Sequence, residues 1–392
     1  MIARHLKSVA VNRYAHQATG QAGVGLVEIM VSLTIGLVII AALVALFVGT
    51  SRNNRQMATA NSMIENGRFA IQLLEEDVIH AGYWGQFVPS FDDQTGSTTI
   101  PPADVPSGLP DPCAVYSSWD AAYRNNVLGM PMQAYETNAV CAGIVTDKLA
   151  DTDMLVVRHV ETCFAGETGC EADTADKLYL QTSLCATDTT RYVMGLTGAT
   201  TFDLHTRACI PTTYAEKRKF VSHIYYVRDY AVTAGDGIPT LMRSEFDLAA
   251  GGSAPAHQDA VPLVEGIDGL RVEFGVDDVS KSGDPVDYST AIDWEDPDLK
   301  TTATNRGDAI PDGPYVRCTT LVACTADQLM NVTSVRIYVL ARSREPTQGY
   351  VDTKTYDLGA GTTLGPYNDE YKRHVYTTTV RLPNIAGRRE RP

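Results

Sequence analysis

The sequence predicts an α+β fold in which one long N-terminal helix packs on a mainly antiparallel β-sheet. The helix is indicated by an apolar run over residues 24–48, followed by residues 50–79, which contain no proline and a single glycine, Gly67. The sheet is indicated by runs rich in Val, Ile, Tyr and Thr after residue 80, separated by stretches rich in Gly, Pro, Ser and Asp. Helical patterns are scarce after residue 80, apart from a short one at 325–330.

The apolar run is long enough to cross a membrane. About twenty residues after Glu28 carry no charge, and at roughly 1.5 Å per helical residue they span about 30 Å, the thickness of a bilayer core. Arg4, Lys7 and Arg13 precede the run without any acid, which predicts a cytoplasmic N-terminus. A secretory signal peptide and a plain signal anchor are the alternatives, but the run is too long for the first and neither explains Glu28.

The second half of the predicted helix is amphipathic. Its apolar residues recur at spacings of three, four or seven: Met57, Ala60, Ile64, Ile71, Leu74 and Val78. We expect this stripe to be the face on which a globular domain packs. The helix is therefore predicted over residues 24–80, transmembrane first and amphipathic after, followed by a β-rich body at 81–392.

The predicted strands of the body alternate in polarity or are rich in β-branched residues. They lie at 154–160, 177–182, 220–228, 263–276, 333–341 and 374–382. Residues 88–110 are rich in Pro, Ser, Thr and Gly and are predicted to form a loop.

The body contains eight cysteines, which allow 105 pairings. If pairing follows proximity in sequence, the pairs are Cys113–Cys141, Cys163–Cys170, Cys185–Cys209 and Cys318–Cys324. Disulfides would require an oxidising compartment such as the periplasm, and free buried cysteines in a cytosolic protein are the alternative. Six of the eight lie between residues 113 and 209, which predicts a loop-rich, disulfide-stapled lobe at about 90–215.

Composition and motifs argue against catalysis and nucleic-acid binding. The formal net charge of −15 disfavours direct contact with nucleic acid, which requires basic surface. The sequence contains no phosphate-binding loop, no dinucleotide fingerprint, no H-E-x-x-H and no G-x-S-x-G. The histidines are scattered, and an isolated strand histidine such as His223 is expected to be structural. We therefore predict no catalytic residue, no cofactor and no metal site.

One stretch partly matches a calcium loop. Asp278, Ser280, Ser282 and Gly283 fit positions one, three, five and six of such a loop. Ser289 stands where a bidentate Glu is needed, so a flexible hairpin loop is the preferred interpretation.

Residues 21–30, QAGVGLVEIM, resemble the processing signal of type IV prepilins. In that family a basic leader ends in Gly, a prepilin peptidase cuts after it, and the fifth mature residue is Glu. Gly23, Val24 and Glu28 fit this spacing, whereas a cut after Gly25 would make Glu28 the third residue. The family usually has Phe where this chain has Val24. The resemblance implies a leader at 1–23, N-methylation of Val24, and pairing of Glu28 with the new amine of its own or a neighbouring subunit during assembly.

Further segments resemble PilW-like minor pilins of the type IV pilus. They are NGRFAIQLLEEDVIHAGYWG at 66–85, PLVEGIDGLRVEFGVDD at 262–278, VRIYVLARSRE at 335–345 and HVYTTTVRLPN at 374–384. The resemblance covers both ends of the chain and is weakest over about 90–215. It is shared in part with the type II secretion pseudopilin GspJ, whose chains are generally shorter and poorer in cysteine.

The resemblance implies the type IV pilin fold and a structural role. Minor pilins of this kind prime pilus assembly and can sit at the tip, supporting adhesion, twitching motility or DNA uptake. The implied partners are the prepilin peptidase, other minor and major pilins, the inner-membrane assembly platform and a tip adhesin. The implied location is the inner membrane, with the body in the periplasm, and then the pilus. A GspJ-like role in a type II secretion pseudopilus is the alternative.

Overall fold

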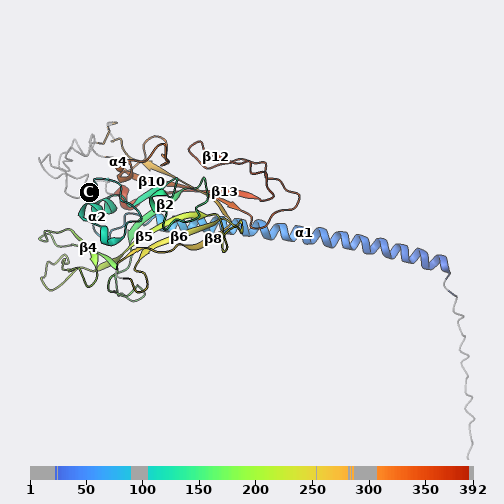
Figure 1. Cartoon of the computed structure of the whole chain (residues 1–392), viewed down its shortest axis with the longest axis horizontal. Coiled ribbons are helices and arrows are strands. Elements are labelled where there is room, and N and C mark those ends of the chain that lie inside the picture. The colour runs from blue at the N-terminus through green and yellow to red at the C-terminus, as the bar shows by residue number, and fades with distance from the viewer. Residues whose placement is uncertain are drawn as a thin grey trace, which may run out of the picture. The chain divides into compact units, whose positions relative to one another are not determined.

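The computed structural model describes residues 23, 25–89, 105–252, 254–280, 283, 285–286 and 307–387. Helix α1 extends from Leu26 to Val78 as one continuous element, coloured blue in Figure 1. Its ends lie two residues inside the predicted limits of 24 and 80. The boundary between two compact units falls inside α1, between Met57 and Ala58, so the second unit begins within the helix.

The elements that follow α1 are mostly strands. In chain order they are η1 (Tyr116–Ser118), α2 (Ala121–Gly129), β1 (Met132–Tyr135), η2 (Ala139–Cys141), β2 (Met154–Val160), β3 (Leu178–Thr182), β4 (Tyr192–Leu196), β5 (Lys217–Arg228), β6 (Thr240–Asp247), β7 (Ala256–His257), β8 (Val261–Glu265), β9 (Ile267–Val276), α4 (Ala326–Met330), β10 (Val332–Arg342), β11 (Tyr356–Asp357), β12 (Thr363–Leu364), β13 (Arg373–Arg381) and α5 (Pro383–Ala386).

These strands form two sheets and a small hairpin. In the larger sheet β1, β2, β5, β3 and β4 follow one another, and β6 pairs with β5, β7 and β8. The smaller sheet has the order β13-β10-β9, and β11 pairs with β12. The ladders between these strands are antiparallel, which confirms the predicted α+β class.

The main core joins the second half of α1 to both sheets. Side chains of α1 share this core with residues of β2 and β5 from the larger sheet and of β9 and β10 from the smaller one. The buried residues of α1 are Met63, Gly67, Ala70, Leu74 and Val78. Burial of this face stabilises the docked half of the helix by the hydrophobic effect.

The predicted apolar stripe of α1 is only partly right. Leu74 and Val78 are buried, but Met57 is 64% exposed and Ile64 is 37% exposed. The buried face instead includes Gly67, where an added Cβ would lie only 2.1 Å from Cε2 of Tyr376. A pattern of large apolar residues misses this face because a glycine there allows β13 to approach the helix closely.

A second core combines residues of the cysteine-rich part of the chain with residues before and after it. Trp84, Trp119, Phe220 and Phe246 pack there with residues of α2, β3 and β4. The ring centroids of Trp119 and Phe246 are 5.2 Å apart, and those of Trp119 and Phe220 are 5.7 Å apart in an edge-to-face arrangement. Strands β1 and β2 also fall within residues 90–215, but one face of each packs in the main core, through Met132 and Ala134 of β1 and Leu155 and Val157 of β2.

The strand predictions are largely confirmed, and the exceptions have local causes. Strand β2 covers 154–160 as predicted, and β3, β5, β10 and β13 match their predictions closely. The single strand predicted at 263–276 is two strands, β8 and β9, separated by Gly266 with φ +75°. An added Cβ at Gly266 would lie 2.7 Å from the carbonyl oxygen of Arg342, so the corner requires glycine.

The short helix predicted at 325–330 is confirmed as α4. Thr325 is its N-cap, and its side chain accepts a hydrogen bond from the backbone N–H of Gln328 while the Gln328 side chain reaches back to the Thr325 N–H. This reciprocal capping box is readable in the sequence TADQ. Helix α2 was not predicted, although Asp120 caps it by accepting a hydrogen bond from the Tyr123 N–H at 2.7 Å.

Candidate functional site

The first half of α1 is apolar and exposed. Its large apolar side chains are exposed along the whole segment. Leu26 near its start is 75% exposed, and Phe47 near its end is 73% exposed. Among the described residues, α1 is the one helix that is long and apolar enough to cross a membrane, and its most apolar stretch has no buried residue. Such a surface is typical of a segment that is covered by lipid or by other helices.

Glu28 lies in the first turn of this helix with its side chain exposed. Its backbone N–H donates to the Gly25 carbonyl at 2.9 Å, and Ser32 Oγ donates to the Glu28 carbonyl. Gly23 is described, whereas Val24 and residues 1–22 lie outside the described residues. Cleavage after Gly23, methylation of Val24 and pairing of Glu28 with an amine therefore stay predictions of the sequence.

The second half of α1 is held by the segments that resemble minor pilins. Asn66 Nδ2 donates to the carbonyl of Glu265 at 3.0 Å, which joins the NGRFA segment of the helix to the LVEGI segment. The neighbouring Gly67 contacts the ring of Tyr376 in the HVYTTTVRL segment. These resemblances thus correspond to contacts that dock the helix.

Two further hydrogen-bonded contacts stabilise the region where α1 docks on the strands. The Arg342 N–H donates to the Gly266 carbonyl at 2.7 Å, which ties β10 to the corner between β8 and β9. Asn384 Nδ2 lies 3.2–3.4 Å from the carbonyl oxygens of Ile79, His80 and Ala81, just after α1 ends. Carbonyls at a helix C-terminus lack partners within the helix, so this side chain satisfies groups that the helix leaves free.

The cysteines form four disulfides in the structure. They are Cys113–Cys141, Cys163–Cys170, Cys185–Cys209 and Cys318–Cys324, the set expected from proximity in sequence. Three of the four lie in the part of the chain before β5. Cys113–Cys141 encloses α2 and β1, and Cys185–Cys209 encloses β4, whereas Cys163–Cys170 closes a short loop between β2 and β3. A disulfide stabilises the folded chain mainly by restricting the unfolded one.

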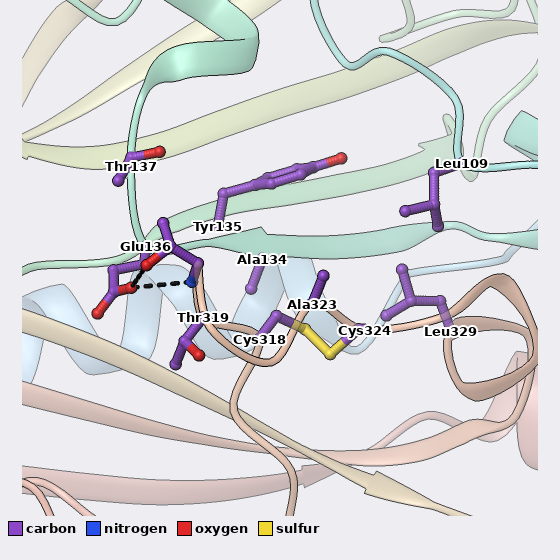
Figure 2. Close-up of a pocket in the computed structure, with 11 residues that line it drawn as sticks. Leu109, Ala134, Tyr135, Glu136, Thr137, Cys318, Thr319, Ala323, Cys324 and Leu329 are labelled. Carbon is purple, nitrogen blue, oxygen red and sulfur yellow. Dashed lines mark hydrogen bonds between the residues drawn. A yellow bond between two sulfur atoms is a disulfide. The ribbon is translucent and has the colours of Figure 1, made fainter.

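A small pocket lies beside the Cys318–Cys324 disulfide. Figure 2 shows this disulfide and Leu329 on one side of it and Tyr135 on the other. Glu136 at its edge accepts hydrogen bonds from the backbone N–H and the hydroxyl of Thr320 at 3.0 and 2.9 Å. The volume is about 120 Å³, whereas sites for drug-sized ligands measure roughly 300–1,000 Å³. The pocket thus suits a few waters rather than a substrate.

Three titratable side chains meet at the end of α1. Asp77 Oδ1 lies 3.0 Å from His159 Nε2, and Asp77 Oδ2 lies 3.0 Å from His223 Nδ1. Burial acts to raise the pKa of Asp77, but the hydrogen bonds from the two histidines outweigh it and hold that pKa well below its usual range. The sequence did not predict this cluster, because its members are separated by 82 and 146 residues.

The partial calcium motif begins a tight turn. Val279 and Pro285 form an isolated antiparallel bridge, and the Gly283 N–H donates to the Ser280 carbonyl at 2.8 Å. These contacts agree with the preferred interpretation as a hairpin loop. Ser282 and Ser289 lie outside the described residues.

A family model and a solved structure are similar to this chain. Residues 224–384, from β5 to α5, match the family model of type IV pilus-assembly protein W. No curated protein sequence matches the chain. Among solved structures it is similar to a type IV-like pilin from Thermus thermophilus, with 10% identity, a TM-score of 0.30, and coverage of 83% of this chain and 97% of that one. The similarity to the family of type IV pilus-assembly protein W thus covers residues 224–384, less than half of the chain.

Proposed function

We propose that the chain is a minor pilin, a structural subunit that helps to initiate type IV pilus assembly and sits at or near the pilus tip. The observation that carries this proposal is the division of α1 into an exposed apolar half and a half docked in the core of the body. The similarity of residues 224–384 to the family of type IV pilus-assembly protein W supports it, because the description of that family names pilus assembly. In this role the protein is not an enzyme.

The exposed half of α1 serves two environments in this proposal. Before assembly it spans the inner membrane, with the N-terminus in the cytoplasm and the disulfide-bonded body in the periplasm. After the prepilin peptidase cuts between Gly23 and Val24, the same apolar surface packs against the helices of other pilins. A surface that is apolar all round suits both lipid and a helical bundle.

Glu28 is the residue that makes the second environment favourable. A carboxylate buried among apolar helices is costly unless a cation pairs with it. The amine of Val24, in the same or a neighbouring subunit, supplies that cation once the leader has been removed. The pair would also favour one axial position of the helix over others.

The proposal is tested by measuring whether, and where, a prepilin peptidase cuts the chain. The full chain is produced with and without a prepilin peptidase, and the products are compared by intact mass and N-terminal sequencing. We expect an N-terminus at Val24 only in the presence of the peptidase, and an uncut protein when Gly23 is changed to Asp. A chain that stays uncut with the peptidase, or that is cut beyond Ala41, would contradict the proposal.

A GspJ-like pseudopilin of type II secretion is the second candidate, because that protein shares the LVEGI-type strand. Cross-linking in native membranes separates the two. Capture of pilins and the pilus assembly platform supports the minor pilin, and capture of secretion pseudopilins supports the alternative.

A further inference from the structure

The cluster at the end of α1 joins one helix to two neighbouring strands. Asp77 comes from α1, His159 from β2 and His223 from β5. Because His223 pairs with Val157 across the ladder and side chains alternate along a strand, His223 and His159 face the same side of the sheet. Their ligand atoms and those of Asp77 all lie within 4.8 Å of one another.

The hydrogen bonds of His159 leave one ring nitrogen directed at the carboxylate. Nδ1 lies 2.9 Å from the backbone carbonyl of Val160, and a carbonyl can only accept, so Nδ1 carries a proton. A neutral His159 would then present the lone pair of Nε2 to an oxygen of Asp77, and two acceptors would repel each other. Either a second proton or a metal ion must lie between them.

The same arrangement is typical of histidines that bind metals. Such a histidine usually donates its other ring N–H to a carbonyl or carboxylate, which orients the ring and fixes the tautomer. His80 is arranged in this way too, with Nδ1 2.7 Å from the Glu76 carbonyl. The ring centroids of His80 and His159 are 5.7 Å apart.

The cluster is enclosed but reachable. The side chains of Asp77, His159 and His223 are only 11–12% exposed. His159 also lines a cavity of about 330 Å³, together with His80 and Glu161. An ion could therefore enter through this cavity and find a fourth ligand there, from a water molecule or from His80.

We propose that Asp77, His159 and His223 bind a divalent transition metal ion such as Zn²⁺, with an open coordination position facing this cavity. Two imidazole nitrogens and one carboxylate oxygen suit Zn²⁺ and its neighbours in the first row, whereas Ca²⁺ and Mg²⁺ take mostly oxygen ligands. The bound ion would tie the last turn of α1 to β2 and β5. This role goes beyond the proposed function, and it differs from the sequence prediction that no metal site is present.

Two substitutions separate metal binding from the hydrogen bonds of the cluster. In His159→Gln the side-chain amide can occupy the place of Nε2, and in His223→Asn it can occupy the place of Nδ1. Both can still donate to Asp77, but an amide is a poor ligand for Zn²⁺. His374→Gln is the matched control, because His374 is an exposed strand histidine on β13, outside the cluster.

The experiment titrates Zn²⁺ into the full chain, prepared without a histidine tag in detergent micelles and first treated with EDTA. We expect one ion per chain with a rise in thermal midpoint, and an affinity at least about tenfold weaker in His159→Gln and in His223→Asn. His374→Gln should bind like the wild type. X-ray absorption at the zinc edge of the wild type should show two imidazole ligands.

Several outcomes would overturn the proposal. The first is no binding of Zn²⁺ by the wild type. The second is binding by both cluster variants that is as tight as binding by the wild type. The third is a loss of affinity in His374→Gln as large as the loss in the cluster variants. If circular dichroism shows that a cluster variant does not fold, the absorption spectrum of the wild type decides, and a spectrum without imidazole ligands rejects the site.

Discussion

The two halves of α1 have the same secondary structure and opposite surroundings. The first half is almost wholly apolar, yet its side chains are exposed; the second half carries many polar residues, yet it is the half that is docked. Docking depends on Gly67, where the missing side chain lets β13 approach the helix, and on Ala70 and Leu74, whose buried side chains fill the space between helix and strands. The number of apolar residues therefore does not predict which part of a helix its own body covers, because steric fit decides where another element can approach.

The largest effect is expected from changing the one acid in the exposed half. Glu28→Val should leave membrane insertion intact, because it removes a charge from an apolar helix, but it should reduce surface piliation severely by removing the partner of the Val24 amine. Membrane fractionation and pilus counts by electron microscopy measure the two effects. Glu65→Val, at an exposed site in the docked half, is the control and should assemble normally. Unchanged piliation in Glu28→Val would remove the proposed role of this carboxylate.

The next largest effect is expected when a leucine in the docked half of α1 is changed, in comparison with a leucine in the exposed half. Leu74 is fully buried and Leu37 is 59% exposed. Leu74→Ala should lower the free energy of unfolding of the body by about 2–5 kcal/mol, because it opens a cavity in the core. Leu37→Ala should change it little. Denaturant unfolding of the full chain in detergent, followed by tryptophan fluorescence, reports this difference through the buried Trp84 and Trp119. Equal effects at the two positions would contradict the division of the helix.

A smaller effect is expected from a pair of glycines. Gly67→Ala places a methyl group against the Tyr376 ring and should destabilise the body by about 1–3 kcal/mol. Gly49→Ala should be neutral or favourable, because an added Cβ at Gly49 has no neighbour within 4 Å and alanine favours the helix. The same unfolding measurement applies. If the clash with Tyr376 is the cause, the double variant Gly67→Ala/Tyr376→Ala should lose less free energy of unfolding than the sum of the losses in the two single variants.

The smallest effect is expected away from α1, where the partly buried ion pair of Asp188 with His205 lies inside the Cys185–Cys209 loop. Hydrogen bonds from the His205 backbone N–H, the Ser183 hydroxyl and the His205 ring lower the pKa of Asp188 to about 2, and Asp188 in turn raises the pKa of His205. The lowered carboxyl pKa stabilises the fold above about pH 4, and this contribution is lost as pH falls toward 2. The raised imidazole pKa stabilises it below about pH 6.5, and this contribution is lost as pH rises through the pKa of folded His205.

The pair therefore contributes most between about pH 4 and 6.5. The difference in thermal midpoint between the wild type and Asp188→Asn should be larger at pH 5.5 than at pH 8.5, and smaller throughout than the effect of Leu74→Ala. A difference that grows from pH 5.5 to pH 8.5 would contradict the assignment.

Much of the architecture followed from local signals. The apolar run and the absence of proline predicted α1, and β-branched runs predicted β2, β5, β10 and β13. Strand β6 was missed because Arg243 and Glu245 interrupt its apolar character, although both lie in a strand paired on two sides. Partners across a ladder stabilise such a strand, and they are absent from a single sequence window.

The histidine cluster shows the same limit at the level of a site. His223 was interpreted as an isolated strand histidine, because no ligand lies near it in the sequence. Only the antiparallel pairing of β2 with β5 and the docking of α1 bring His159 and Asp77 to it. Neither the ladder register nor the rotation of the helix is encoded in the spacing of these three residues.

The sequence by itself determined the features that depend on neighbouring residues. These are the apolar first half of α1 with Glu28 inside it, the spacing of Gly23 to Glu28, and the capping box of α4, because each is read within a few residues. The tertiary structure alone decided the buried face of α1 at Gly67, the corner at Gly266, and the meeting of Asp77, His159 and His223. Each of these depends on how closely two distant segments approach, which steric fit sets only after the chain has folded.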